Sequence, residues 1–147
     1  MAESPGPTLP ALPDVNVLVA LTNLAHQHHR AAHQWLDGAP GFATTPVTEI
    51  GLLRLLLNRS VTGQEVTARQ ALGVLAGVRA HERAVFLPDD TSLSEAGLDL
   101  VGLSGHRQVT DAHLVNLART HGCQMVTFDR RITSSLAPDD RHWVTVL

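Results

Sequence analysis

Short apolar runs alternate with longer stretches of helical spacing along this sequence, and this alternation limits the possible folds most strongly. The apolar runs are residues 11–15, 41–45, 84–88, 123–128 and 142–147, and the helical stretches are residues 16–24, 28–38, 46–58, 64–79, 92–103, 109–122 and 130–136. Strands separated by helices pair in parallel, because each helix returns the chain to the same edge of the sheet. The sequence therefore predicts an α/β fold with a central parallel sheet of about five strands and helices on both faces.

The length of 147 residues is sufficient for one domain with a buried core. We expect this domain to span residues 9–147 and to follow a disordered tail at residues 1–8. The first residues lack the basic and apolar regions of a secretory signal, and no apolar stretch is long enough to span a bilayer. We therefore expect a cytoplasmic protein with no membrane partner.

The charge of the chain excludes some partners and mechanisms. A net charge of −3 provides no long-range positive field for capturing nucleic acid, although a local group of arginines or a bound metal could still bind it. All 11 basic residues are arginine, so mechanisms that need a lysine are excluded. The single Cys123 excludes an internal disulfide and a cysteine-based zinc site.

Four acidic residues lie where strands and helices meet. Asp14 and Asp129 end apolar runs, whereas Glu49 and Asp111 lie in the first turn of a helix and begin its apolar stripe. The carboxyl ends of parallel strands and the N-termini of the following helices share one edge of a sheet. We therefore predict that these four carboxylates lie at the same edge.

Each acid also has a purely structural explanation. Glu49 and Asp111 suit the positive end of a helix dipole, and Asp14 and Asp129 could be ordinary turn residues. If the four converge, however, each pair of like charges 4 Å apart costs about 4 kcal/mol at an effective dielectric of about 20. A divalent cation would remove this repulsion, and oxygen ligands without cysteine favour Mg²⁺ or Mn²⁺.

The segments around the four acids resemble the acidic blocks of PIN-domain ribonucleases, specifically VapC-type toxins of bacterial VapBC toxin–antitoxin systems. These segments are "DVNVLVAL", "TPVTEIGLLRLLLN", "VTDAHLVNLA" and "VTFDRRI", and the resemblance covers residues 11 to about 132. It implies a three-layer α/β/α PIN-like fold and a Mg²⁺- or Mn²⁺-dependent endoribonuclease. Such an enzyme is a phosphodiester hydrolase that cleaves structured cellular RNA with a metal-activated water.

The resemblance also implies roles for individual residues. The metal-binding and catalytic acids of the family correspond to Asp14, Glu49, Asp111 and Asp129. We expect Asp14 and Asp111 to be direct metal ligands, and the other two acids to hold metal-bound waters or a second ion. Thr127 corresponds to a hydroxyl position that supports the metal-bound water, and Asn16 corresponds to a polar position beside the first aspartate.

Partners follow from the same resemblance. It implies a cognate VapB-type antitoxin that covers the acidic groove, and a homodimer that assembles with the antitoxin into a heterotetramer or hetero-octamer. For the RNA substrate, Arg130 and Arg131 are the expected backbone contacts, because arginine presents a bidentate fork to phosphate. His106 and Arg107 precede the Asp111 helix and are further candidates. The family favours a tRNA or rRNA loop as the target, and the sequence does not specify which.

Other functions deserve comparison. His29 and His33, within the cluster from His26 to His33, are one helical turn apart and could bind Zn²⁺, but no carboxylate accompanies them at ligand spacing. An aspartyl-phosphate enzyme would need a lysine, which is absent, and a second aspartate where Asn16 stands. A PIN-like module that binds RNA or protein without cleaving it would be expected to lack an acid, but all four are present.

Two further groups near the predicted edge have open interpretations. Asp89 and Asp90 follow the third apolar run, so they could extend the acidic site or form a simple turn. His113 lies two residues after Asp111 and is expected to point away from the acidic face, in a structural role.

Overall fold

A computed structural model describes residues 9–147, so the predicted tail at residues 1–8 lies outside the described residues. The strands are β1 (Leu12–Pro13), β2 (Phe42–Thr44), β3 (Ala84–Phe86), β4 (Met125–Thr127) and β5 (Val144–Val146). All strand pairs are parallel: β4 lies between β1 and β5, and β2 pairs with β3. The Ala43 amide donates to the Ala11 carbonyl at 2.8 Å and joins both groups in the order β3-β2-β1-β4-β5. The predicted parallel sheet of about five strands is confirmed.

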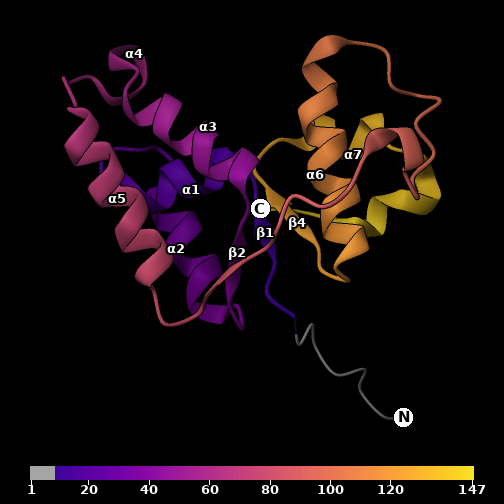
Figure 1. Cartoon of the computed structure of the whole chain (residues 1–147), viewed down its shortest axis with the longest axis horizontal. Coiled ribbons are helices and arrows are strands. Elements are labelled where there is room, and N and C mark those ends of the chain that lie inside the picture. Colours follow the sequence, from indigo (N-terminus) through magenta and orange to yellow (C-terminus); the bar gives the residue numbers. More distant parts are fainter. Residues whose placement is uncertain (1–8) are drawn as a thin grey trace.

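Helices cover both faces of this sheet. They are α1 (Val15–Thr22), α2 (His29–Gly38), α3 (Pro46–Leu56), α4 (Arg59–Thr62), α5 (Ala68–Ala80), α6 (Val109–Thr120) and α7 (Arg130–Ser135), with 3₁₀ turns η1 (Leu93–Glu95), η2 (His106–Gln108) and η3 (Pro138–Trp143). Figure 1 shows α1, α2, α3 and α5 on one side of the strands and α6 and α7 on the other. The architecture is three-layered, as predicted. No helix within residues 9–147 is long and apolar enough to cross a membrane.

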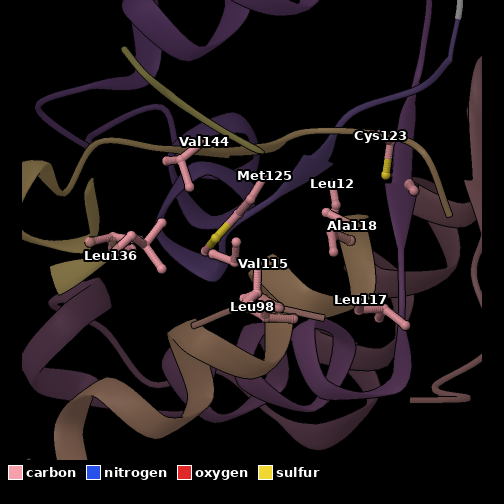
Figure 2. Close-up of a cluster of buried hydrophobic side chains, with 12 residues drawn as sticks. Leu12, Leu98, Val115, Leu117, Ala118, Cys123, Met125, Leu136 and Val144 are labelled. Atoms are coloured by element: carbon pink, nitrogen blue, oxygen red, sulfur yellow. The ribbon is translucent and has the colours of Figure 1, made fainter. Parts of the chain in front are cut away.

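The largest hydrophobic core lies between the sheet and α6. Leu114, Val115, Leu117 and Ala118 of α6 are buried against strand residues that include Leu12 and Met125. Figure 2 shows several of these side chains gathered around Met125 and Val115. Because α6 is held so firmly, its first turn has a fixed position over the carboxyl ends of β1 and β4.

The opposite face of the sheet carries a second core. Val126 alternates with Met125 along β4 and packs against Val17 and Ala20 of α1 and Ala32 of α2. A third cluster joins α1 to α3 and α5 without a strand, through Leu18, Val19, Leu52, Leu56 and Ala71. Helix α1, which begins directly after β1, therefore packs on both the sheet and the outer helices.

The helix predicted over residues 92–103 is wrong: only the 3₁₀ turn η1 forms there, followed by a loop. Side chains satisfy the backbone amides that a helix would have used. The amide of Gly97 donates to Asn116 Oδ1 at 3.1 Å, that of Asp99 donates to Asp140 Oδ2 at 2.9 Å, and that of Val101 donates to Asp99 Oδ1 at 3.0 Å. Asparagine and aspartate side chains often compete with helices in this way.

The start of one helix and the burial of another also differ from the prediction. Residues 64–67 are not helical, because Gly63 ends α4 at a φ of 74° and a capping box at Thr67 begins α5. The sequence of α3 is apolar nearly all round and predicts a buried helix, yet Ile50 and Leu57, the residue directly after the helix, have exposed fractions of 58% and 50%. One stripe of α3 contacts α1 and α5, and the rest of its surface is open in this chain.

We predict opposite effects for two helical glycines replaced by alanine. A Cβ at Gly51 of α3 would lie 2.5 Å from Val15 Cγ2, and β-branched Val15 begins α1 and cannot easily move aside. Gly51→Ala should therefore lower the free energy of unfolding by about 1–3 kcal/mol. A Cβ at Gly73 of α5 meets nothing within 4 Å, so Gly73→Ala should raise this free energy by about 0.5–1 kcal/mol.

Urea denaturation of both variants and the parent provides the measurement. Equal stability of Gly51→Ala and the parent would contradict the close packing of α3 on α1.

Candidate active site

Asp14 is a buried carboxylate that links β1 to α1. Its amide donates to the Val126 carbonyl at 2.7 Å, which extends the pairing with β4 one residue beyond β1. Its side chain caps α1, because Oδ1 accepts from the Val15 amide at 2.7 Å. The other carboxylate oxygen, Oδ2, accepts from Thr127 Oγ1 at 3.0 Å. Burial raises the pKa of Asp14, and the two hydrogen bonds oppose this change. The fold thus accommodates the acid partly through the N-terminus of a helix.

Thr127 connects two of the predicted acids. This fully buried residue at the end of β4 donates its hydroxyl to Asp14, and its oxygen accepts from the Asp129 amide at 3.0 Å. One hydroxyl therefore fixes the side chain of Asp14 and the backbone that carries Asp129. These contacts fix the positions of Asp14, which follows β1, and Asp129, which follows β4, relative to each other.

Asp129 is paired with an arginine. Arg131 Nε donates to Asp129 Oδ1 and Arg131 Nη2 donates to Oδ2, both at 3.0 Å, and the Arg131 amide also donates to Oδ1 at 3.0 Å. These bonds hold the pKa of Asp129 below its ordinary value, chiefly through the guanidinium. Arg131, predicted to contact RNA, therefore also neutralises one acid of the site.

Asp111 lies in the first turn of α6, as predicted, and its charge interacts with those of Asp14 and Asp129. Burial, followed by the negative charges of Asp14 and Asp129, raises the pKa of Asp111 to about 6, although the positive charge of Arg131 opposes this rise. Asp14, Asp111 and Asp129 thus share one electrostatic field although they are far apart in the sequence. The structure brings these three predicted residues together.

Glu49 lies at the same edge of the sheet but in a separate hydrogen-bonding group. Its Oε2 accepts from Thr44 Oγ1 at 2.7 Å and lies 3.7 Å from Arg79 Nε. Thr44 ends β2, the neighbour of β1, and the Arg79 guanidinium lies 4.6 Å from the centroid of the Phe86 ring. Thr44 and Arg79 were not anticipated from the sequence, because a contact between α5 and α3 leaves no local pattern.

The carboxylates share a field but do not form a compact coordination sphere. Within residues 9–147, no three His, Cys, Asp or Glu side chains are placed to hold one metal ion. The donor set nevertheless fits a hard divalent cation, since all donors are carboxylate oxygens and burial with mutual repulsion disfavours the charged form of Asp111. Asp14 and Asp111 are the residues that could hold such an ion, with Asp129 beside them and Glu49 in its separate group with Thr44 and Arg79.

Two clefts flank the pair formed by Asp129 and Arg131. The first, of about 370 Å³, is lined by Gly105, His106, Arg107, Gln108, Asp111, Asp129, Arg131, Ile132 and Ser135. The second, of about 350 Å³, is lined by Asn16, His26, Gln27, His28, Phe128, Asp129 and Arg131. His106 and Arg107 therefore lie beside Asp111 as predicted, and the exposed Asn16 lines the second cleft. Arg130 is exposed and lines neither cleft.

Three other histidines that the sequence analysis considered have structural contacts. His29 Nδ1 lies 2.7 Å from the Ala20 carbonyl and His33 Nε2 lies 2.9 Å from the Leu21 carbonyl, so both rings bind the last turn of α1. A zinc site at these two residues finds no support. The structural role predicted for His113 agrees with its contact to Asp89 Oδ1 at 2.6 Å.

Asp89 and Asp90 do not extend the acidic site. Asp89 binds His113 as described, and Asp90 Oδ1 lies 2.8 Å from His121 Nε2. Both histidines belong to α6 or its C-terminal end. These two hydrogen-bonded pairs connect the segment directly after β3 with α6.

The raised pKa of Asp111 predicts a pH-dependent effect of Asp111→Asn. Since the pKa rises from 3.8 to about 6, the folded chain binds more protons than the unfolded chain between these values, and stability falls as pH rises through this window. In EDTA at pH 8, Asp111→Asn should be more stable than the parent by about 1 kcal/mol, after discounting for solvent screening. Near pH 4 the difference should vanish.

Thermal unfolding at several pH values measures this effect, with Asp139→Asn as the control because Asp139 is exposed. A stability difference that is the same at pH 4 and pH 8 would contradict the electrostatic origin.

Comparisons with known proteins identify the family of this chain. The family model described as "PIN domain" matches residues 11–134. "Ribonuclease VapC39" of Mycobacterium tuberculosis (strain ATCC 25618 / H37Rv) is 43% identical over 129 residues, which cover 85% of this chain and 92% of that protein. "Ribonuclease VapC29" of the same strain is 45% identical over 117 residues, which cover 79% of this chain and 83% of that protein.

A solved structure supports the fold. The crystal structure of Mycobacterium tuberculosis VapC20, described as a sarcin-ricin loop cleaving toxin, matches with a TM-score of 0.59 and 19% identity. The match covers 85% of this chain and 94% of that one. The PIN-domain match and the sequence identity to two VapC ribonucleases confirm the resemblance seen in the sequence: the chain belongs to the PIN-domain family of VapC-type ribonucleases.

Proposed function

We propose that this ribonuclease is a Mg²⁺- or Mn²⁺-dependent endoribonuclease that cleaves structured RNA as the toxin of a toxin–antitoxin pair. The observation that carries the proposal is the shared field of Asp14, Asp111 and Asp129 at the carboxyl edge of the sheet. The alternative, a PIN-like module that binds without cleaving, gives no reason for Asp14 and Asp111 to lie out of water near a further negative charge, where the pKa of both is raised.

Asp14 and Asp111 are the proposed metal ligands. Each oxygen of Asp14 accepts one hydrogen bond, from Val15 or Thr127, which orients the carboxylate and leaves lone pairs for a cation. A bound metal would lower the pKa of a coordinated water and neutralise charge on the phosphate. Thr127 acts here as a positioning residue, because its fully buried hydroxyl donates to Asp14 Oδ2 and fixes that carboxylate.

Glu49 and Asp129 are proposed to hold metal-bound waters or a second ion. Both already have an arginine partner, Arg79 for Glu49 and Arg131 for Asp129. An arginine-paired carboxylate gains less from direct contact with a cation than an unpaired one, since part of its charge is already offset. This difference supports an indirect role for these two acids.

The RNA backbone is proposed to enter the first cleft beside Asp111. His106 and Arg107 line that cleft, and Arg131 lines both clefts. Arg131 uses two side-chain N–H groups for Asp129, so three remain available for phosphate oxygens. The exposed Arg130 would contact the backbone only outside the clefts.

A VapB-type antitoxin is the proposed partner that keeps the acidic edge covered. A homodimer of the toxin is proposed as well, assembled with the antitoxin into a heterotetramer or hetero-octamer. Exposed apolar side chains on and directly after α3 and on α5, among them Ile50, Leu57 and Leu72, support an interface between copies. These partners follow from membership of the family.

Cleavage of structured RNA is expected to require a divalent metal and both proposed ligands. With Mn²⁺ or Mg²⁺ the purified chain should cleave the RNA, and EDTA should abolish cleavage. Asp14→Asn and Asp111→Asn should each reduce the cleavage rate about a hundredfold or more, since a neutral amide is a poor ligand for these ions.

Asp139→Asn is the matched control, because it makes the same chemical change at an exposed acid in η3. Cleavage that survives EDTA, or that continues at the parent rate in the Asp14 and Asp111 variants, would contradict the proposal.

Arg131→Gln should bind Mn²⁺ a few-fold more tightly than the parent. The variant removes a cation that neutralises Asp129 and lowers the negative field at Asp111. Its affinity for RNA should fall at the same time, because a phosphate contact is lost.

Isothermal titration with Mn²⁺ and an RNA-binding assay in EDTA provide the two measurements. Arg130→Gln is the control, since it removes the neighbouring arginine that lines neither cleft. Weaker Mn²⁺ binding by Arg131→Gln would exclude the neutralising role of Arg131.

A further inference from the structure

We propose that His28 and Phe128, with His26 beside them, form a subsite that binds an unpaired RNA base next to the scissile phosphate. This inference depends on the proposed function for its ligand, RNA. It concerns the second cleft, to which the proposed metal site assigns no function.

The aromatic rings of this subsite come from two distant parts of the chain. His26 and His28 lie in the connection between α1 and α2, and Phe128 follows β4. The rings of His28 and Phe128 are stacked, with centroids 4.5 Å apart and an interplanar angle of 15°. The His26 ring lies 5.7 Å from that of His28 at an angle of 44°. The three rings form a partly exposed aromatic wall.

The second cleft has the size and the polar groups that a nucleotide needs. Its volume is about 350 Å³, and the exposed side chains of Asn16 and Gln27 line it together with the rings. Stacking on aromatic side chains and hydrogen bonding of the base edges by amide side chains are the usual means of binding unpaired RNA bases. The cleft offers both.

The position of the second cleft relative to the acids determines which nucleotide of a bound RNA could reach it. Asp129 and Arg131 line both this cleft and the one that contains Asp111. A phosphate at Arg131 would therefore lie between the acidic cleft and the aromatic wall. A base attached to that phosphate can reach His28 while the neighbouring phosphate remains near Asp111.

Other aromatic and histidine side chains differ from this group. Phe42 is buried in the core, Phe86 lies under the Arg79 guanidinium, and the rings of His29 and His33 bind backbone carbonyls of α1. The ring of His28 makes no such hydrogen bond within residues 9–147, and although His28 precedes α2 its side chain does not cap the helix. Replacement of His28 therefore removes a stacking surface and no structural hydrogen bond.

The subsite predicts a preference for RNA with an unpaired base beside the cleavage site. Stacking on a ring accepts any base, because each has a π-face, so the preference concerns base pairing more than base identity. A fully paired duplex cannot place a base in the cleft without opening the pair. The substrate class is thus a single-stranded loop or bulge.

The test measures binding of an RNA hairpin whose loop carries a fluorescent base analogue that is quenched on stacking. The full chain with Asp111→Asn serves as the parent, so that the RNA stays intact. Adding His28→Ala should weaken binding about tenfold, within the range for loss of one stacked base, and should remove the quenching at one loop position. Adding His28→Phe should retain both, because it keeps the ring.

His142→Ala is the matched control. The His142 ring also contacts an aromatic neighbour, with its centroid 4.4 Å from that of Trp143 at an interplanar angle of 42°. His142 precedes β5 and lies at the edge of the sheet opposite to the acids. This variant should bind like the parent. Thermal unfolding of every variant confirms that it is folded.

Parent-like affinity and quenching in His28→Ala would overturn the subsite, and so would an equal loss in His142→Ala. A parallel cleavage assay with the wild-type chain and Mn²⁺ separates this failure from that of the proposed function. If the wild type cleaves and His28→Ala binds normally, only the subsite is excluded. If the wild type neither cleaves nor binds RNA, both proposals are excluded.

Discussion

The hydrogen bond from Thr127 to Asp14 is the contact on which the rest of the site depends. It joins the ends of two neighbouring strands, and the same hydroxyl accepts from the Asp129 amide. Since Thr127 is fully buried, water does not compete for these bonds, and both aspartates are held with little freedom. Asp111 is added from α6, whose apolar stripe fixes its first turn above the same edge. A rigid scaffold thus places charged groups that would otherwise separate.

The fold offsets only part of the negative charge that it gathers. Arginines pair with Glu49 and Asp129, whereas neither Asp14 nor Asp111 forms an ion pair within residues 9–147. Burial and repulsion instead raise the pKa of both unpaired acids. This unfavourable arrangement reduces the stability of the chain alone and is the feature that a divalent cation would relieve. The two acids without an arginine are the two proposed as direct ligands.

Much of the fold could be predicted from local patterns. The strands, and the helices that carry Glu49 and Asp111, follow from apolar periodicity because each element buries one stripe of its own sequence. The same reasoning failed at residues 92–103, where side chains of Asn116 and Asp140 hold the backbone in a loop. It also failed on the burial of α3, since a sequence that is apolar all round does not reveal how many neighbours the helix has. Both errors concern contacts between distant residues.

The sequence by itself determined that the acids stand at the ends of strands and the beginnings of helices, because these positions depend on local order and on the parallel sheet. Only the tertiary structure decided which acids receive an arginine and which rings meet beside them. Arg79 reaches Glu49 from another helix, and His28 stacks on Phe128 across 100 positions of the chain. Such pairings arise from the packing of distant elements, and no periodicity within one segment encodes them.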